Sequence, residues 1–316
     1  MVGRRHPLVR VMMRWVPLHV GISMLLVTFL MSLPSAHAAS SITCPAEATP
    51  AATSTVTPQP QAEAEAPYAG ATFPEGGGSL TVFAAASLTD AFTAMKTRLE
   101  SAHPGLTITF NFAGSQALVT QLSQGAKADV FASANLRQMA VANEQGLIAG
   151  TPVVFTLNRL TIVVPKDNPA HIQSPADLAK PGIRLVLEQA DVPAGQYARE
   201  SLCKMATDPG TYGEQFVERV AANIVSEEDN VRSVLTKVQL GEADAGIVYV
   251  SDIHADVRDQ VQTIEIPDEV NVTARYPIAP VTGGNEELAR AFIAFVLSDE
   301  GQKILREFGF PGKPNP

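Results

Sequence analysis

The chain has 316 residues, of which 46% are hydrophobic and 17% charged, a composition typical of a globular protein with one large or two medium domains. Its formal charge is −9, and residues 1–38 hold four of the 23 basic residues and none of the 32 acidic ones, so the remainder carries −13. Such acidity argues against general nucleic-acid binding, because the phosphate backbone attracts basic surfaces.

The N-terminus has the pattern of an export signal. Arginines precede an apolar run at 16–33, and the small residues at 36–38 fit a signal-peptidase site. We therefore expect residues 1–38 to be a signal peptide cleaved before Ala39, which places the protein in the periplasm or on the outer face of the cytoplasmic membrane.

Two alternatives stay open. One is an uncleaved anchor, since about 18 apolar residues just span a bilayer; the other is lipidation at Cys44, although the residues before it make a poor lipobox.

Residues 39–78 consist mainly of Ala, Thr, Pro, Glu, Gln and Gly, with few large apolar side chains. We expect a disordered tether, because this segment has little to bury against the entropy cost of ordering. It either spaces the folded part from a membrane or wall, or is an ordinary flexible N-terminus.

The two cysteines, Cys44 and Cys203, could pair in an oxidising compartment. One lies in the tether and the other in a helical stretch, so we expect a buried lone thiol at Cys203 instead. The sequence has no Cys/His cluster with metal-ligand spacing, no nucleotide fingerprint and no histidine placed to serve a serine. We therefore expect neither an enzyme nor a cofactor.

From Ser79 onward, short β-rich runs alternate with helical patterns, which predicts an α/β fold with mainly parallel sheets. The strand candidates are residues 80–84, 106–112, 129–132, 159–164, 183–187, 245–249, 262–266 and 275–281. The helix candidates are residues 88–101, 115–124, 135–145, 174–179, 195–206, 212–222, 230–240, 251–256, 285–297 and 299–307.

Two of these strands, at 160–164 and 276–281, are spaced as if the chain leaves one lobe and later returns to it. We therefore predict that lobe 1 consists of residues 79–157 and 275–316, and lobe 2 of residues 158–274. Each has the size needed for its own core.

In lobe 1, two strands run directly into helices through a serine. Ser87 follows the strand at 80–84 and is predicted to be a helix N-cap, with Asp90 completing a capping-box pattern. Ser115 repeats this role after the strand at 106–112. Each joint directs unpaired N–H groups and the positive end of a helix dipole at one spot, which suits an anion.

Lobe 2 offers similar joints. Residues 192–197 open a helix that exposes the N–H of Ala194 behind a proline, and residues 228–232 open another with Asn230 as a candidate cap. Tyr249 ends a strand, at the edge where ligands of open α/β sheets bind.

Five segments, in this order, resemble the molybdate-binding periplasmic proteins (ModA type) of bacterial ABC importers. They are residues 83–88 (FAAASL), 112–115 (FAGS), 192–195 (VPAG), 228–232 (EDNVR) and 246–252 (GIVYVSD). The resemblance covers about residues 79–312 and leaves out the tether.

The resemblance implies a ligand set of two serines from the first lobe, with two backbone amides and a tyrosine from the second. In this sequence those positions are Ser87, Ser115, Ala194, Val231 and Tyr249. It also implies a type II periplasmic binding protein, with two lobes of mainly parallel sheet flanked by helices, joined by two crossing strands that close on the ligand. Such a protein is a monomer that captures molybdate, and also tungstate, without a cofactor and passes it to an ABC permease and its ATPase.

The chemistry of the donors agrees with this ligand. Molybdate is a fully deprotonated tetrahedral dianion, so its oxygens only accept hydrogen bonds and a site of pure donors suits it. A carboxylate pointing into the site would repel it and would suit a protonated oxyanion such as hydrogen phosphate. Two alternatives stay open: a binding protein of the same fold for sulfate or phosphate, and a membrane-tethered sensor domain.

Overall fold

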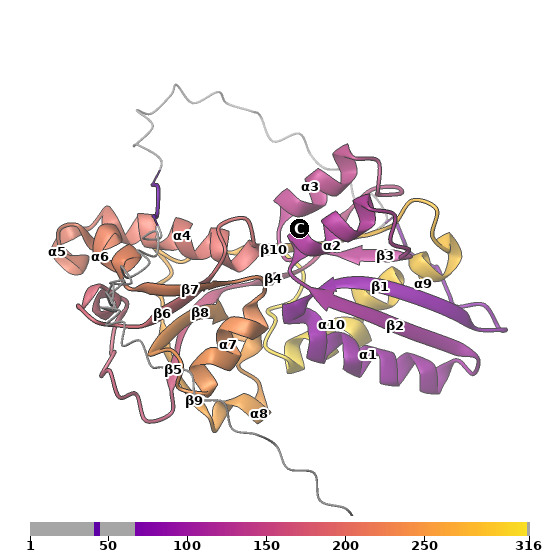
Figure 1. Ribbon diagram of the computed structural model, residues 1–316. Helices are drawn as coiled ribbons and strands as arrows, with labels where there is room; N and C mark the ends of the chain where they lie inside the picture. The colour runs from indigo at the N-terminus through magenta and orange to yellow at the C-terminus, as the bar shows by residue number, and fades with distance from the viewer. Residues whose placement is uncertain (1–40, 45–66, 315–316) are drawn as a thin grey trace, which may run out of the picture. The chain divides into compact units, whose positions relative to one another are not determined.

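The computed structural model describes residues 41–44 and 67–314. The predicted signal peptide and most of the predicted tether lie outside the described residues. The chain from Ala39 onward belongs to a single unit, whose described part contains two five-stranded sheets with helices on both faces of each (Figure 1). We call them lobe 1 and lobe 2.

The lobe 1 sheet has the strand order β2-β1-β3-β10-β4. The strands are β1 (Gly78–Ala85), β2 (Leu106–Ala113), β3 (Val130–Ala132), β4 (Val153–Asn158) and β10 (Ala274–Pro280). Helices cover both faces, and they are α2 (Ser115–Ser123) and α3 (Leu136–Glu144) on one face, and α1 (Thr89–Ala102), α9 (Glu286–Leu297) and α10 (Asp299–Glu307) on the other.

The lobe 2 sheet has the strand order β7-β6-β8-β5-β9. The strands are β5 (Leu160–Pro165), β6 (Leu185–Glu188), β7 (Ile224–Glu228), β8 (Ala245–Tyr249) and β9 (Val261–Glu265). The helices are α4 (Pro193–Ala206) and α6 (Phe216–Ala222) on one face, α7 (Val231–Gln239) on the other, and the single turns α5 (Pro209–Tyr212) and α8 (Ala255–Arg258). Three 3₁₀ turns complete the described elements: η1 (Ala86–Leu88), η2 (Pro175–Ala179) and η3 (Val250–Asp252).

The chain enters lobe 2 between β4 and β5, where one residue, Arg159, separates the strands, and it returns to lobe 1 between β9 and β10. In the described part of the chain, the antiparallel strand pairs all involve β5 or β10, the strands that the chain enters from the other lobe. The remaining neighbouring pairs are parallel. The two-lobe α/β fold is confirmed, and the sheets are mixed rather than mainly parallel.

Sequence patterns missed two strands, β4 and β7. β7 carries only two apolar residues and is half exposed, so it lacks an apolar run. β4 adjoins β5 with almost no turn between them, which hides the boundary. The helix expected at 212–222 begins later, as α6 at Phe216, because Gly213 adopts a φ of 89° and ends the preceding turn α5 at Tyr212.

Alternating side chains of β1 face two separate clusters. Leu80 and Val82 pack into the larger one, which includes residues of both lobes, while Phe83 packs with α2 and α3 in a smaller one. Within the larger cluster, Phe155 and Phe310 stand edge-on to the ring of Tyr276, with centroids 6.3 and 5.7 Å away. These contacts hold that fully buried ring in place.

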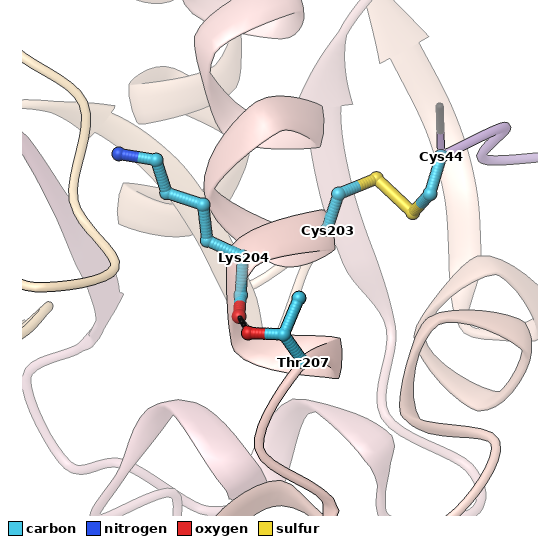
Figure 2. The surroundings of a disulfide bond; sticks show 4 residues. All are labelled: Cys44, Cys203, Lys204 and Thr207. Atoms are coloured by element: carbon cyan, nitrogen blue, oxygen red, sulfur yellow. Dashed lines mark hydrogen bonds between the residues drawn. A yellow bond between two sulfur atoms is a disulfide. The ribbon is translucent and has the colours of Figure 1, made fainter. Parts of the chain in front are cut away.

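A disulfide joins Cys44 to Cys203 of α4, with 5.5 Å between their Cα atoms (Figure 2). One turn further along the helix, the hydroxyl of Thr207 donates to the carbonyl of Lys204 at 2.8 Å. The prediction of a lone thiol at Cys203 is therefore wrong. It failed because 159 residues separate the cysteines and nothing in the tether's composition shows that its first residues, including Ile42, pack against the core. Lipidation would need the same Cys44 sulfur, so the disulfide and a lipid anchor at Cys44 exclude each other.

Candidate functional site

A small pocket lies where the two lobes meet, and we call it the interlobe pocket. Its walls are the ends of β1, β2, β6 and β8 and the starts of α2, α4 and α7. Its volume, counted as the space open to the centre of a water molecule, is about 10 Å³. Pockets for drug-sized ligands measure hundreds of Å³, so the interlobe pocket fits a small ion and not a sugar, peptide or nucleotide.

Three helices begin at this pocket: α2 at Ser115, α4 at Pro193 and α7 at Val231. The first N–H groups of a helix have no partner within it, and the helix dipole adds partial positive charge there. Each of these helices has at least nine residues, and they come from both lobes. Their N-termini therefore favour an anion in the pocket.

Ser87 lines the pocket from the turn η1 and is 3% exposed. Its Oγ lies 2.9 Å from the hydroxyl oxygen of Tyr276. The prediction that Ser87 caps a helix with Asp90 is wrong, because η1 moves the start of α1 beyond Ser87 and α1 has no side-chain cap. Asp90 instead pairs with Arg232 and His254 of lobe 2.

Ser115 is the first residue of α2 and is fully buried in the pocket wall. The helix has Gly114 at its N-cap position, so the predicted capping role of Ser115 is also wrong. Its Oγ accepts a hydrogen bond from the backbone N–H of Ala134 at 3.0 Å. Because that bond uses only a lone pair, the Ser115 proton stays free to donate to a ligand.

Val231 lines the pocket as the first residue of α7. The side chain of Asn230 accepts from the backbone N–H of Ser233 at 3.1 Å, which confirms the predicted cap. This cap leaves the Val231 N–H without a partner in its own helix.

Tyr249 ends β8 in the pocket wall and is 1% exposed. Among the described residues its hydroxyl makes no hydrogen bond of ordinary geometry, although its ring stands edge-on to Tyr276 with centroids 5.7 Å apart. Burial, and then the neighbouring Tyr276, raise the pKa of Tyr249 well above its usual value of 10, so the hydroxyl keeps its proton. Leaving such a group unpaired costs about 1–3 kcal/mol, and an acceptor in the pocket would remove that cost.

Four of the five predicted residues line the interlobe pocket: Ser87, Ser115, Val231 and Tyr249. The fifth, Ala194, is not part of the wall. Ala194 is the second residue of α4, but the pocket wall there is formed by Val192, Pro193 and Glu188. The Glu188 carboxylate accepts from the N–H of Gly195 at 3.0 Å and also interacts with the N–H of Ala194.

Glu188 was not predicted from the sequence, and it places a carboxyl group in a pocket expected to contain only donors. It is 4% exposed, and burial raises its pKa to about 8, with Asp252 and Asp229 adding to the rise and the N–H groups of α4 opposing it. At neutral pH the group is therefore mostly protonated and able to donate a hydrogen bond. Its place at the C-terminal end of β6, where ligands of α/β sheets bind, was the available signal.

Direct contacts hold the lobes together around the pocket. Among the side chains of lobe 1 that hydrogen bond to lobe 2, Gln116 donates to the Asp229 carbonyl at 3.0 Å, Gln138 to the Asp191 carbonyl at 3.1 Å and Asn135 to Gln196 at 3.3 Å. Gly114 lies so close to lobe 2 that a Cβ there would be 2.3 Å from the Asp229 carbonyl oxygen. The lobes are thus in contact, as expected of a closed form.

The family model for bacterial extracellular solute-binding proteins matches residues 80–311. The molybdate-binding protein ModA of Mycobacterium tuberculosis is 41% identical over 237 residues, which cover 75% of this chain and 85% of that protein. ModA of Haemophilus influenzae is 32% identical over 241 residues, covering 74% and 90%.

Among solved structures, the substrate-binding domain of a putative molybdenum ABC transporter from Clostridium difficile matches with a TM-score of 0.55 and 29% identity. The match covers 75% of this chain and 99% of that one. These matches confirm the expected resemblance, and the family consists of proteins that bind solutes rather than of enzymes. The chain belongs to the bacterial extracellular solute-binding proteins.

Proposed function

We propose that this protein captures molybdate in the interlobe pocket and delivers it to an ABC importer. The observation that carries the proposal is the buried hydroxyl of Tyr249, which makes no hydrogen bond of ordinary geometry among the described residues, in a pocket where three helices begin. The identity to ModA proteins over most of the chain supports molybdate as the particular ion.

The ligand groups would be the hydroxyls of Ser87, Ser115 and Tyr249 and the backbone N–H groups of Ala194 and Val231. Each donates a hydrogen bond to an oxyanion that can only accept. Because the donors come from both lobes, the bound ion favours the closed arrangement by its differential contacts with it. Tungstate, with the same charge and shape, is the second expected ligand.

Glu188 fits this ligand only in its protonated form. A protonated carboxyl can donate to an oxyanion oxygen, and it is a weaker acceptor than a carboxylate, which frees the N–H of Ala194 for the ligand. The pKa of Glu188 at about 8 supports that state at neutral pH. Molybdate binding should therefore weaken as the pH rises above about 8.

Glu188 also supports a second candidate, an oxyanion that carries a proton, such as hydrogen phosphate. An ionised Glu188 would accept the P–O–H proton, and binding would then strengthen as the carboxyl loses its own proton. The sign of the pH dependence above pH 7 separates the two candidates.

The family and the disulfide support an exported protein. The family is extracellular, and a disulfide between Cys44 and Cys203 suits the oxidising side of the membrane. In the ranges 41–44 and 67–314, no helix is long and apolar enough to cross a bilayer. The proposal includes cleavage of residues 1–38, and a monomer on the periplasmic side that serves an ABC permease and its ATPase. Residues 39–78 would be an N-terminal segment that the disulfide attaches to lobe 2. The predicted lobe boundaries shift by one residue at each crossing, because Asn158 ends β4 and Ala274 begins β10 in the lobe 1 sheet.

The test is thermal unfolding of the chain from residue 39, which keeps both cysteines, with molybdate, tungstate, sulfate or phosphate. A ligand at about 1,000 times its Kd adds roughly 4 kcal/mol of stability, a shift of several degrees in Tm. A shift with molybdate and tungstate alone is expected. A shift with phosphate alone would transfer the proposal to the second candidate, and no shift with any anion would contradict both.

A further inference from the structure

Ser87 begins a chain of buried hydrogen bonds that runs from the interlobe pocket to the crossing between the lobes. The hydroxyl oxygen of Tyr276 lies 2.9 Å from Ser87 Oγ and accepts from Asn158 Nδ2 at 3.2 Å. Asn158 Nδ2 also donates to Ser251 Oγ at 2.8 Å. All four side chains are 3% exposed or less, so water does not compete for these bonds.

The orientation of the Asn158 amide is fixed by a backbone donor. The backbone N–H of Arg159 can only donate, and it donates to Asn158 Oδ1 at 2.9 Å. This makes Oδ1 the acceptor and turns the NH₂ group toward Ser251 and Tyr276. Tyr276 therefore accepts a hydrogen bond from Asn158, and we assign its own O–H as the donor in the contact with Ser87 Oγ.

A donated hydrogen bond from Tyr276 determines what Ser87 can do. With one lone pair of Oγ engaged by the tyrosine, the Ser87 proton points away from Tyr276, and Ser87 lines the interlobe pocket. Hydrogen bonds in series also polarise one another in a low-dielectric interior. Ser87 is thus presented to the pocket as a donor.

The groups that set this direction sit on rigid elements. Asn158 is the last residue of β4, and Tyr276 lies on the neighbouring strand β10. The Tyr276 ring is packed edge-on against Phe155 and Phe310. Neither side chain can turn without disturbing the core.

We propose that Tyr276 and Asn158 are positioning residues that orient Ser87 as a hydrogen-bond donor and so favour a fully deprotonated oxyanion over one that carries a proton. The inference rests on the proposed function, because it takes Ser87 as a ligand group. If the network only satisfied buried polar atoms, breaking it would lower stability and leave the contribution of Ser87 to binding unchanged.

The test is a double-mutant cycle in which molybdate is titrated calorimetrically into the wild type, Ser87→Ala, Tyr276→Phe and the double variant. Tyr276→Phe should weaken binding about tenfold when Ser87 is present and less than about twofold when it is absent, because the effect passes through Ser87.

Tyr68→Phe is the matched control, since it removes another buried tyrosine hydroxyl of lobe 1, which bonds to the Thr151 carbonyl at 2.8 Å. It should leave affinity unchanged. Equal losses from Tyr276→Phe in both backgrounds would overturn the inference.

Asn158→Asp tests the same chain with a side chain of the same size and covers the case in which Tyr276→Phe does not fold. A carboxylate only accepts, so Tyr276 would donate to the introduced carboxylate and Ser87 would turn its proton toward Tyr276. The added negative charge weakens molybdate binding equally with Ser87 and with Ser87→Ala. The reversed hydrogen bond between Ser87 and Tyr276 causes a further loss only in the protein that has Ser87. Absence of this extra loss contradicts the inference. A wild type that binds no molybdate contradicts the proposed function itself.

Discussion

At the scale of single residues, the pocket depends on groups that can give a proton. Tyr249 is the donor with the clearest signature, since its buried hydroxyl has no hydrogen-bond partner of ordinary geometry within the described ranges. Replacing Tyr249 with Phe should weaken molybdate binding by roughly 1.5–3 kcal/mol, the range for a hydrogen bond to a charged group. Isothermal titration measures the loss. Tyr212→Phe, on α5 and outside the pocket wall, is the control. Unchanged affinity in the Tyr249 variant would remove that residue from the site.

Glu188 should make stability depend on pH. Its pKa is about 8 in the folded protein against an ordinary 4.5, so between these values the folded state binds more protons than the unfolded state. The free energy of unfolding therefore falls as pH rises through this window, by at most about 1.4 kcal/mol per pH unit for one group. Glu188→Gln cannot titrate and still offers an oxygen to the Gly195 N–H. Its unfolding free energy, from urea titrations at pH 5, 6, 7 and 8, should fall less steeply.

A part of the slope will persist in that variant below pH 6, because burial also raises the pKa of Asp252 to about 6. Glu214→Gln, at an exposed position, is the control and should keep the wild-type slope. Parallel curves for the wild type and Glu188→Gln would show that Glu188 is ionised throughout.

The residue types of the site were more predictable from the sequence than their contacts. The serines and the tyrosine stood out by their place at strand ends, the resemblance to the molybdate-binding proteins implied their role as ligands, and four of the five predicted positions line one pocket. Their bonding was not predictable, because η1 shifts the start of α1 and because the partner of Ser87, Tyr276, is 189 residues away in the chain. Glu188 was overlooked since a strand-ending glutamate is usually solvated.

At the scale of elements, the starts of helices decide how closely the lobes approach. Gly114 precedes α2 with an ordinary φ of −59°, so alanine fits the backbone without strain. In the closed form, however, its Cβ would lie 2.3 Å from the Asp229 carbonyl of lobe 2. Gly114→Ala should therefore keep the Tm of the ligand-free protein within a few degrees and weaken molybdate binding by at least about tenfold.

The matched control for this change is Gly76→Ala, because a Cβ at Gly76 meets nothing within 4 Å. Titration of both variants with molybdate separates a block on closure from a general effect of the substitution. Wild-type affinity in Gly114→Ala would show that the lobes close with more space there than the structure has.

Elements with strong periodicity were predictable, and those shaped by contacts with the rest of the chain were not. The helix predicted at 299–307 is α10 residue for residue, because its pattern places apolar side chains on one face. β7 was missed because its pairing with β6, rather than its own apolar content, makes it a strand. The antiparallel entry of β5 and β10 depends on the path between lobes, which local patterns do not encode.

At the scale of the whole molecule, the two lobes are joined by more than the crossing strands. The disulfide attaches residues 41–44 to α4 of lobe 2, while Tyr68 is buried in lobe 1 with its hydroxyl bonded to the Thr151 carbonyl. The segment predicted to be a tether is therefore fixed to the folded part near both of its ends. Composition alone predicts a solvated chain there, because it says nothing of two anchoring residues.

A charged cluster also bridges the lobes. Asp90 of α1 pairs with Arg232 of α7, and its carboxylate lies 3.0 Å from the Nε2 atom of His254. The carboxylate belongs to lobe 1 and both partners belong to lobe 2, so the cluster exists only while the lobes are together. The side chains of Asp90 and Arg232 are 32% and 26% exposed, so salt screens the pair less than it screens a surface pair.

Asp90→Asn should therefore destabilise the closed form relative to the open one. A partly buried ion pair contributes about 1 kcal/mol, so molybdate affinity should fall about fivefold, mainly through faster release. The difference from wild type should shrink in high salt. Stopped-flow release and calorimetric titration at low and high ionic strength measure both effects. Glu300→Gln is the control, because it breaks an exposed pair with Arg98 that lies within lobe 1 and should not change affinity. A lower Tm of the ligand-free Asp90→Asn protein, together with a molybdate affinity whose difference from wild type does not change with salt, would give the opposite result. The cluster would then stabilise lobe 1 itself and would not hold the lobes closed.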